Sequence, residues 1–225
     1  MVLAVMLVIR HRTPRLAAAF VLALSALTLW QDSALEVLPS HHGLALSFVA
    51  VLSVIGCSRL TCVGGAMEAA RTAAARWWIV PVGRLLGLIL LLLPVALGVG
   101  TALVVGRVGG VSLPVFAMTA LLLATALGSL TLSMTPFAGA SGAAGVGFML
   151  ALAGGIRPSA ISLVLDQLRL IRDPVVLLWN HLPLLWRANS WLIAGEPSFI
   201  LHSSVWIGIG VAVTSYTLSV RYRTG

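Results

Sequence analysis

Long apolar runs, separated by short charged or Gly/Pro-rich breaks, recur along the whole chain. An α-helix needs ~20 apolar residues to cross a bilayer, and several of these runs approach that length. Hydrophobic residues make up 60% of the 225 residues and charged residues only 9%, whereas about a quarter of a soluble domain is charged. The runs lack the alternation of membrane-barrel strands, so helices are expected to satisfy their backbone in lipid. The sequence therefore predicts an all-α integral membrane protein.

The pattern predicts six transmembrane helices in a single domain covering residues 1–225. The expected spans are Leu16–Trp30, Leu44–Cys57, Leu85–Val105, Val111–Met134, Ala143–Leu165 and Ser204–Val220. Their orientation follows from the arginines, because the cytoplasmic segments of membrane proteins carry the basic excess. With the N-terminus inside, the inner segments sum to +8, which is the formal net charge of the whole chain, and the outer segments sum to zero. Both termini are thus expected in the cytoplasm, and the charge reflects topology rather than nucleic-acid binding.

Two segments on the cytoplasmic side are expected to lie along the membrane. The apolar stretch within residues 1–15 is too short to cross and predicts an interfacial helix whose arginines face lipid phosphates. Residues 64–84 place apolar and polar side chains on different faces at helical spacing, which predicts an amphipathic helix. The expected anchors at the inner interface are Arg10, Arg12, Arg15, Trp77 and Trp78.

On the outer side, residues 157–203 are long for a loop and far from polar. Asp166, Arg169 and Asp173 are expected on one helical face, with apolar residues opposite them. Tryptophans follow, and tryptophan is enriched at the level of the lipid headgroups. The segment therefore predicts helices that lie in, or dip into, the outer leaflet before the last span.

The cytoplasmic segment also carries a motif. It opens with Glu68-Ala-Ala-Arg71 and ends with Pro81-Val82-Gly83-Arg84, directly before a long apolar run. This resembles the permease subunits of type-2 ABC exporters, in which a glutamate opens the helix between the second and third spans and a Pro-Val-x-Arg turn precedes the third. The overall layout of the chain is similar to that family as well. The usual Glu-Arg-Glu opening is reduced to Glu68-Ala-Ala, however, and Thr72 replaces an expected glycine.

The resemblance implies that residues 64–76 form a coupling helix, which docks on separate cytoplasmic ABC ATPase subunits that bind ATP and Mg. The residues it assigns to coupling are Glu68, Arg71, Arg76, Pro81 and Arg84. A second permease copy or a homologue would complete the transporter in a bacterial cytoplasmic (inner) membrane and move a hydrophobic or amphipathic substrate. The chain has no lysine and hence no Walker A site, so it is not expected to be the ATPase itself. As the permease subunit that the resemblance implies, it would be no enzyme and would bind no cofactor. The simpler alternative is a juxtamembrane helix held by arginine–phosphate contacts.

Two other functions stay open at the level of sequence. Gly139-Ala140-Ser141-Gly142 is similar to the Gly-x-Ser-Gly of rhomboid intramembrane proteases, and His202 is the histidine that could serve as base. Ser141 is expected at the cytoplasmic face and His202 at the outer face, however, and small residues also serve close helix packing. A non-catalytic scaffold or assembly subunit of a larger membrane complex is equally compatible with six apolar helices.

Four histidines are expected on the outer side, namely His41, His42, His181 and His202. A metal site needs converging ligands with support from neighbouring groups, and a sequence does not reveal convergence. We therefore interpret these histidines as residues of a polar interface, and we expect no metal ligand among them.

Overall fold

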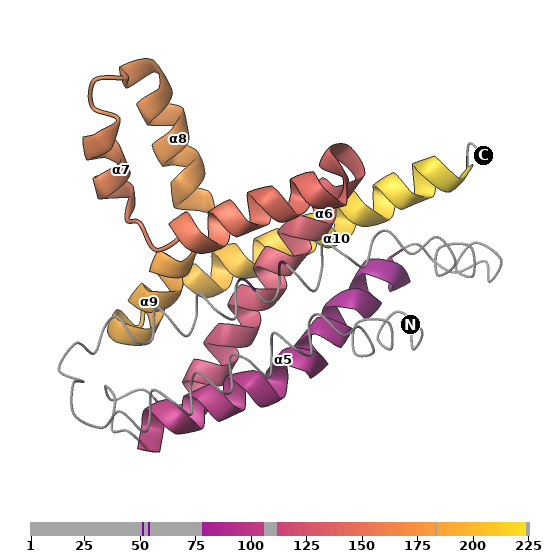
Figure 1. The fold of residues 1–225 in the computed structure, drawn as a ribbon, viewed down its shortest axis with the longest axis horizontal. Coiled ribbons are helices and arrows are strands. Elements are labelled where there is room, and N and C mark those ends of the chain that lie inside the picture. The colour runs from indigo at the N-terminus through magenta and orange to yellow at the C-terminus, as the bar shows by residue number, and fades with distance from the viewer. Residues whose placement is uncertain (1–50, 52–53, 55–77, 106–111, 183, 224–225) are drawn as a thin grey trace.

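The computed structural model describes residues 51, 54, 78–105, 112–182 and 184–223, and its regular elements are helices. They are α5 (Ile79–Val105), α6 (Leu113–Ala153), α7 (Pro158–Val164), α8 (Arg169–His181), α9 (Leu185–Ala194) and α10 (Ser198–Arg223) (Figure 1). The all-α class is thus confirmed for this part of the chain. The expected span Leu16–Trp30 and the segment 1–15 lie outside the described residues, as does Leu44–Cys57 apart from the helical Val51 and Val54.

Three helical segments are long and apolar enough to cross a membrane. These segments are Ile79–Thr101, Leu113–Gly139 and Ser198–Val220. They correspond to the expected third, fourth and sixth spans. The chain therefore has the helices of a membrane protein in the part that the structure describes, although six spans are not seen there.

The third expected span begins earlier than predicted, because α5 starts at Ile79 rather than at Leu85. Pro81-Val82-Gly83-Arg84 consequently belongs to the first turns of α5, and the predicted turn before the span is wrong. Proline is tolerated there because it lacks only an N–H group, and the first N–H groups of a helix have no intrahelical acceptor in any case.

Helix α6 reverses direction at Gly139, whose backbone has φ 70° and ψ 175°. This combination is essentially restricted to glycine, because a Cβ atom would clash with the backbone. The turn divides α6 into a first arm, residues 113–138, and a second arm, residues 140–153. In Figure 1 the first arm climbs to the turn, and the second arm returns from it toward α9.

The fifth expected span, Ala143–Leu165, does not form one helix. The second arm ends at Ala153, and α7 begins as a separate helix at Pro158. At 1.5 Å per residue the second arm is only about 20 Å long, whereas the hydrocarbon core of a bilayer is about 30 Å thick. Gly154 and Gly155 end the helix, and Pro158 is accepted at the start of the next one. The prediction of a single full-length helix here is wrong.

The expected outer excursion, residues 157–203, is helical as predicted and consists of α7, α8, α9 and the start of α10. Helices α7 and α8 form a hairpin that projects from the rest of the molecule (Figure 1). Asp166 lies in the turn between them, so it does not share a helical face with Asp173. The predicted common face is wrong because the chain reverses between these two residues.

The first arm of α6 forms the centre of the packing, between α5 and α10. Its apolar side chains and those of α5 make the main core, in which the large fully buried members are Leu88, Leu92, Phe116, Leu123, Leu127, Leu132 and Phe199. A Cβ atom on Gly147 would lie 2.7 Å from Val54 Cγ1 and 2.8 Å from Thr131 Oγ1. The second arm therefore fits tightly between the first arm and the helical residue Val54.

Buried hydroxyl groups on α6 are mostly satisfied within the helix itself. Thr119 donates to the Val115 carbonyl at 2.7 Å, and Thr131 donates to the Leu127 carbonyl at 2.8 Å. Ser133 and Thr135 bond to their own helix in the same way. Such bonds to the preceding turn are the usual solution for Ser and Thr in apolar surroundings. As a result, the interior around α6 presents little free hydrogen-bonding capacity.

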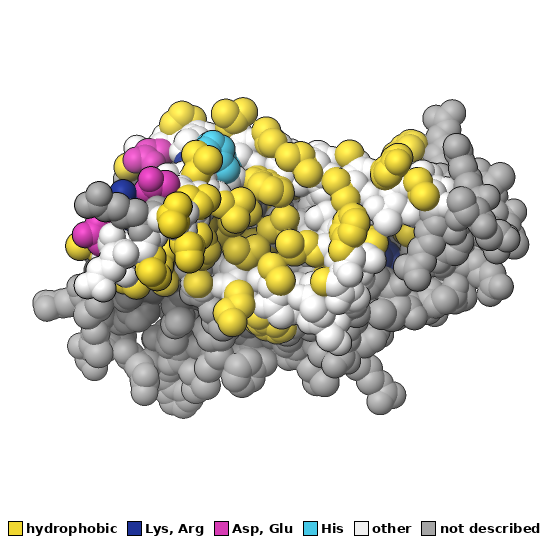
Figure 2. Space-filling view, turned by 90° about the horizontal axis from the view of Figure 1, so that it is seen from above, with side chains coloured by type: hydrophobic (Ala, Val, Ile, Leu, Met, Phe, Trp, Pro, Cys, Tyr) yellow, Lys and Arg dark blue, Asp and Glu magenta, His cyan; other side chains and the backbone are white. Residues whose placement is uncertain are grey.

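The surface of the described residues is largely apolar. Figure 2 shows hydrophobic side chains spread over one face, with acidic side chains and histidine gathered toward one end. Leu170 at the hairpin is 94% exposed, and Leu163 and Val164 are similarly uncovered. An apolar surface of this extent is expected of helices whose surroundings are lipid or another protein.

Candidate functional site

Three of the residues assigned to coupling or anchoring lie in the described part of the chain. Trp78 is 47% exposed just before α5, whereas Pro81 is buried in the first turn. Arg84 is only 4% exposed, which is unusual for an arginine and places its charge inside the packing rather than on the surface. The predicted residues outside the described part are Arg10, Arg12, Arg15, Glu68, Arg71, Arg76 and Trp77.

Ser141 and His202 are not brought together as a serine protease would require. Ser141 is exposed near the Gly139 turn, which Figure 1 places well away from the start of α10. His202 instead lies beside His181, and its Nδ1 donates to the Ser198 carbonyl at 2.6 Å. The nucleophile and its base must be within hydrogen-bonding reach of each other. The arrangement therefore offers no support for a Ser141–His202 pair.

Polar groups instead gather where α8, α9 and α10 meet. We call this region the α8–α10 junction and define it by Trp179, His181, Trp186, Arg187, His202 and Trp206. Trp179 Nε1 donates to the Ile156 carbonyl at 2.9 Å, and Trp206 Nε1 donates to the His181 carbonyl. The backbone N–H of Trp186 donates to the Gly154 carbonyl at 2.8 Å. These bonds attach the helical excursion to the second arm of α6 and to α10.

Arg187 is the charged residue at the centre of the junction. Its Nη1 donates to Ser198 Oγ at 3.1 Å, and its Nη2 donates to the Asn180 carbonyl. The guanidinium also stands 4.6 Å from the centre of the Trp186 ring, within range of a cation–π interaction. Burial lowers the pKa of Arg187, and the negative charge of Glu196 raises it in part. One side chain on α9 thus connects α8 with the start of α10.

Five buried polar atoms near the junction have no hydrogen-bond partner among the described residues. They are Trp186 Nε1, Arg187 Nε, Asn189 Oδ1, Trp191 Nε1 and Ser203 Oγ. Ser203 is completely buried, with 0% of its surface exposed. Because an unpaired buried polar group costs free energy, each of these atoms is a place where water or a bound molecule would be stabilised. Two of them belong to Trp186 and Arg187, so the junction is a candidate binding site in this part of the chain.

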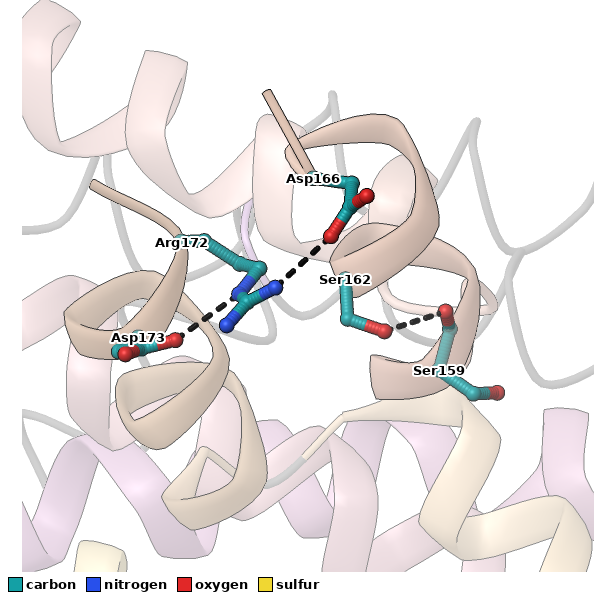
Figure 3. Close-up of polar contacts among 5 residues, drawn as sticks. All are labelled: Ser159, Ser162, Asp166, Arg172 and Asp173. Atoms are coloured by element: carbon teal, nitrogen blue, oxygen red, sulfur yellow. Dashed lines mark hydrogen bonds and ion pairs between the residues drawn. The ribbon is translucent and has the colours of Figure 1, made fainter. Parts of the chain in front are cut away.

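A second polar group lies at the tip of the α7–α8 hairpin, where Figure 3 shows the Arg172 guanidinium between two carboxylates. Arg172 Nε contacts Asp173 Oδ1, and Arg172 Nη1 contacts Asp166 Oδ1, each at 2.9 Å. The hydrogen bond and charge of Asp173 raise the pKa of Arg172, and Asp166 adds to this. Both carboxylates are exposed, so the pairs stabilise the turn little, and the three side chains together keep a net charge of −1.

An open groove of about 480 Å³ runs along the hairpin and is lined by residues of both its helices, including Ser162, Arg172 and Asn180. Asn180 connects this groove to the α8–α10 junction, because its carbonyl accepts the hydrogen bond from Arg187. The groove itself is shallow and carries charged residues at its tip, so it has the features of a surface rather than of an enclosed pocket.

The sequence did not single out Arg187, Asn189 or Ser203. In the sequence, Arg187 contributes only to the charge balance of the outer segments. An arginine next to a tryptophan in an apolar stretch can nevertheless indicate a cation–π contact. Ser203 could not be found in this way, because its burial depends on how α9 packs against α10.

Comparison with models of known protein families, with curated proteins and with solved structures gives no match to this chain.

Proposed function

We propose that the chain is the membrane-spanning permease subunit of an ABC exporter in the cytoplasmic (inner) membrane of a bacterium. Cytoplasmic ATPase subunits would supply the energy, with ATP and Mg bound on them, and a second permease copy or homologue would complete the path. The chain itself would perform no chemistry and would move a hydrophobic or amphipathic substrate. The proposal extends the resemblance seen in the sequence and is supported by the three long apolar helices of the described residues.

The observation that carries the proposal is the unequal burial of the long helices. In the most apolar window of α6, 78% of the residues are buried within the chain, whereas in that of α10 only 22% are. Within the described part of the chain, α10 therefore keeps most of its surface uncovered. A permease that pairs with another copy needs such a face, and lipid would cover what remains.

The interior of the described helices supports an apolar substrate. The hydroxyl groups of Thr119, Thr131 and Thr135 are already bonded to carbonyls of their own helix, at 2.7 to 2.9 Å. A path along these helices would offer few polar partners, and a strongly polar solute would lose its hydration without compensation.

The experiment tests whether the expected coupling residues bind an ATPase subunit. The tagged full chain is extracted in mild detergent from its native membranes, and its co-purifying partners are examined for a Walker A ATPase and for ATP hydrolysis. We expect an ATPase in stoichiometric amount, and we expect the double charge reversal E68R/R71E to remove it. The matched control is R157E, which reverses the charge of an exposed arginine before α7 and should leave the complex intact.

The proposal fails if no ATPase co-purifies and if E68R/R71E leaves transport or complex formation unchanged. Stable incorporation into a larger complex without nucleotide dependence would favour the scaffold function instead. Labelling of Ser141 by a fluorophosphonate would favour the protease.

A further inference from the structure

Two histidines that are far apart in the sequence meet at the α8–α10 junction. His181 is the last residue of α8, and His202 lies in the first turns of α10. Their ring centres are 5.9 Å apart, and the ring planes are inclined at 58°. The sequence placed both residues on the outer side but did not indicate that they are neighbours.

The hydrogen bonds of the two rings determine which nitrogen is free. His181 Nδ1 lies 2.7 Å from the Leu177 carbonyl, and His202 Nδ1 lies 2.6 Å from the Ser198 carbonyl. Because a carbonyl oxygen only accepts, each Nδ1 must carry the proton. In the neutral form of each ring, Nε2 then holds the lone pair. A histidine that binds a metal through one nitrogen normally donates its other N–H to a carbonyl or carboxylate in this way.

The separation of the rings is close to that around a shared ion. Two imidazoles bound through Nε2 at about 2.0–2.1 Å to one tetrahedral ion hold their ring centres roughly 5 Å apart, so the observed 5.9 Å would have to shorten by about 1 Å on binding. We propose that His181 and His202 form a binding site for a divalent transition-metal ion that bridges α8 and α10.

The chemistry of the ligands selects the class of metal. Imidazole suits Zn²⁺, Cu²⁺ and Ni²⁺, whereas Mg²⁺ and Ca²⁺ prefer oxygen ligands. No three His, Cys, Asp or Glu side chains in the described ranges are placed so that they could hold a metal ion together, so water would complete the coordination shell. The nearby charge of Arg187 opposes a cation, and we therefore expect weaker binding than at a closed structural zinc site.

A metal at this position would have a mechanical effect. Trp206 Nε1 already donates to the His181 carbonyl, so the end of α8 is attached to α10 by one hydrogen bond. A bridging ion would add a second connection between the projecting hairpin and the long helix α10. Metal binding would thus hold the α7–α8 hairpin against the bundle and raise the thermal stability of the protein by mass action.

The test measures binding of Zn²⁺ to the purified full chain by calorimetry, after removal of any polyhistidine tag. We expect one saturable ion per chain. In H181A and in H202A the affinity should fall at least tenfold, since even the mutation of a residue that only supports a metal ligand commonly lowers metal affinity that much. The matched control H11A removes a histidine elsewhere in the sequence and should bind as the wild type does. The absence of saturable binding, or unchanged affinity in both variants, would overturn the site.

A second measurement keeps the proposal testable if the variants fold poorly. The electron paramagnetic resonance spectrum of Cu²⁺ added to the variant H11A/H41A/H42A, in which His181 and His202 are the remaining histidines, should show coupling to two imidazole nitrogens. A spectrum of oxygen ligands alone would contradict the site. Neither measurement requires an ATPase or a transport assay, so the outcome is independent of the proposed exporter function.

Discussion

Ser129 on α6 lies directly against Gly210 on α10. Ser129 Oγ donates to the Ile207 carbonyl at 3.1 Å, and a Cβ atom on Gly210 would come within 2.6 Å of the Ser129 carbonyl oxygen. The backbones of the two helices are therefore in contact. The hydroxyl of Ser129 holds the contact by a hydrogen bond, and the lack of a side chain on Gly210 makes the close approach possible. Small residues allow the same kind of approach between helices in lipid generally.

The first prediction concerns this contact. G210A should destabilise the protein by about 1–3 kcal/mol, because the new methyl group meets backbone that cannot move aside. The matched control is G208A on the same helix, where a Cβ atom meets nothing within 4 Å. That substitution should be neutral or stabilising by up to about 1 kcal/mol through helix propensity. Thermal unfolding in detergent, followed by tryptophan fluorescence, measures both, and equal melting temperatures for the two variants would contradict the packing.

The second prediction compares two buried hydroxyl groups. S129A removes the bond to the Ile207 carbonyl and should cost about 0.5–1.5 kcal/mol. S203A removes a hydroxyl that is buried without a partner among the described residues, so it should be neutral or stabilising. Denaturation of both variants under the same conditions gives the comparison. A loss in S203A as large as that in S129A would mean that Ser203 Oγ is bonded in the membrane.

The third prediction separates two glycines that have almost the same φ. Gly139 has φ 70° and ψ 175°, and Gly195 has φ 69° and ψ 24°. Asparagine tolerates the second conformation, which is ordinary left-handed helix, but not the first. In thermal unfolding, G195N should therefore change stability little, whereas G139N should cost about 1–3 kcal/mol. A Cβ atom added at either position would meet nothing within 4 Å, so crowding does not contribute to the difference.

The fourth prediction concerns Arg187. R187A leaves the Asn180 carbonyl and Ser198 without their donor, and it should cost about 1.5–3 kcal/mol, as expected for hydrogen bonds from a charged group. R187K keeps the charge but not the planar fork, so it should recover only part of this loss. R157A, at an exposed arginine before α7, is the control and should be nearly neutral. Limited proteolysis between α8 and α9 provides the measurement, with faster cleavage expected in the order R187A, R187K, wild type.

The long helices could be predicted from the sequence because their apolar runs are nearly free of charge. The start of α5 was missed, since Pro81 and Arg84 are signals of a helix end or a surface in most contexts. Here Pro81 is accommodated in the first turn of the helix, and Arg84 is buried in the packing. The break after Ala153 was missed because Gly154 and Gly155 are common inside membrane helices, so local composition alone did not distinguish a break from a continuous span.

The features of the candidate site depend on contacts between distant residues, and periodicity carries no information about these. The approach of His181 to His202, and the position of Arg187 between Asn180 and Ser198, follow from the way in which α8, α9 and α10 fold back on one another. The coupling residues Glu68, Arg71 and Arg76 remain predictions, because they lie outside the described residues.

The hydrogen bond between the Trp186 N–H and the Gly154 carbonyl has a consequence for the end of the second arm. A helix of about 20 Å that starts at one surface ends inside the hydrocarbon, where a terminal carbonyl finds no water and costs several kcal/mol if left unpaired. The backbone of α9 supplies the missing donor at 2.8 Å. This bond satisfies one of the carbonyls that the end of the second arm leaves unpaired, so at that group α9 takes the place that water would have at an exposed helix end.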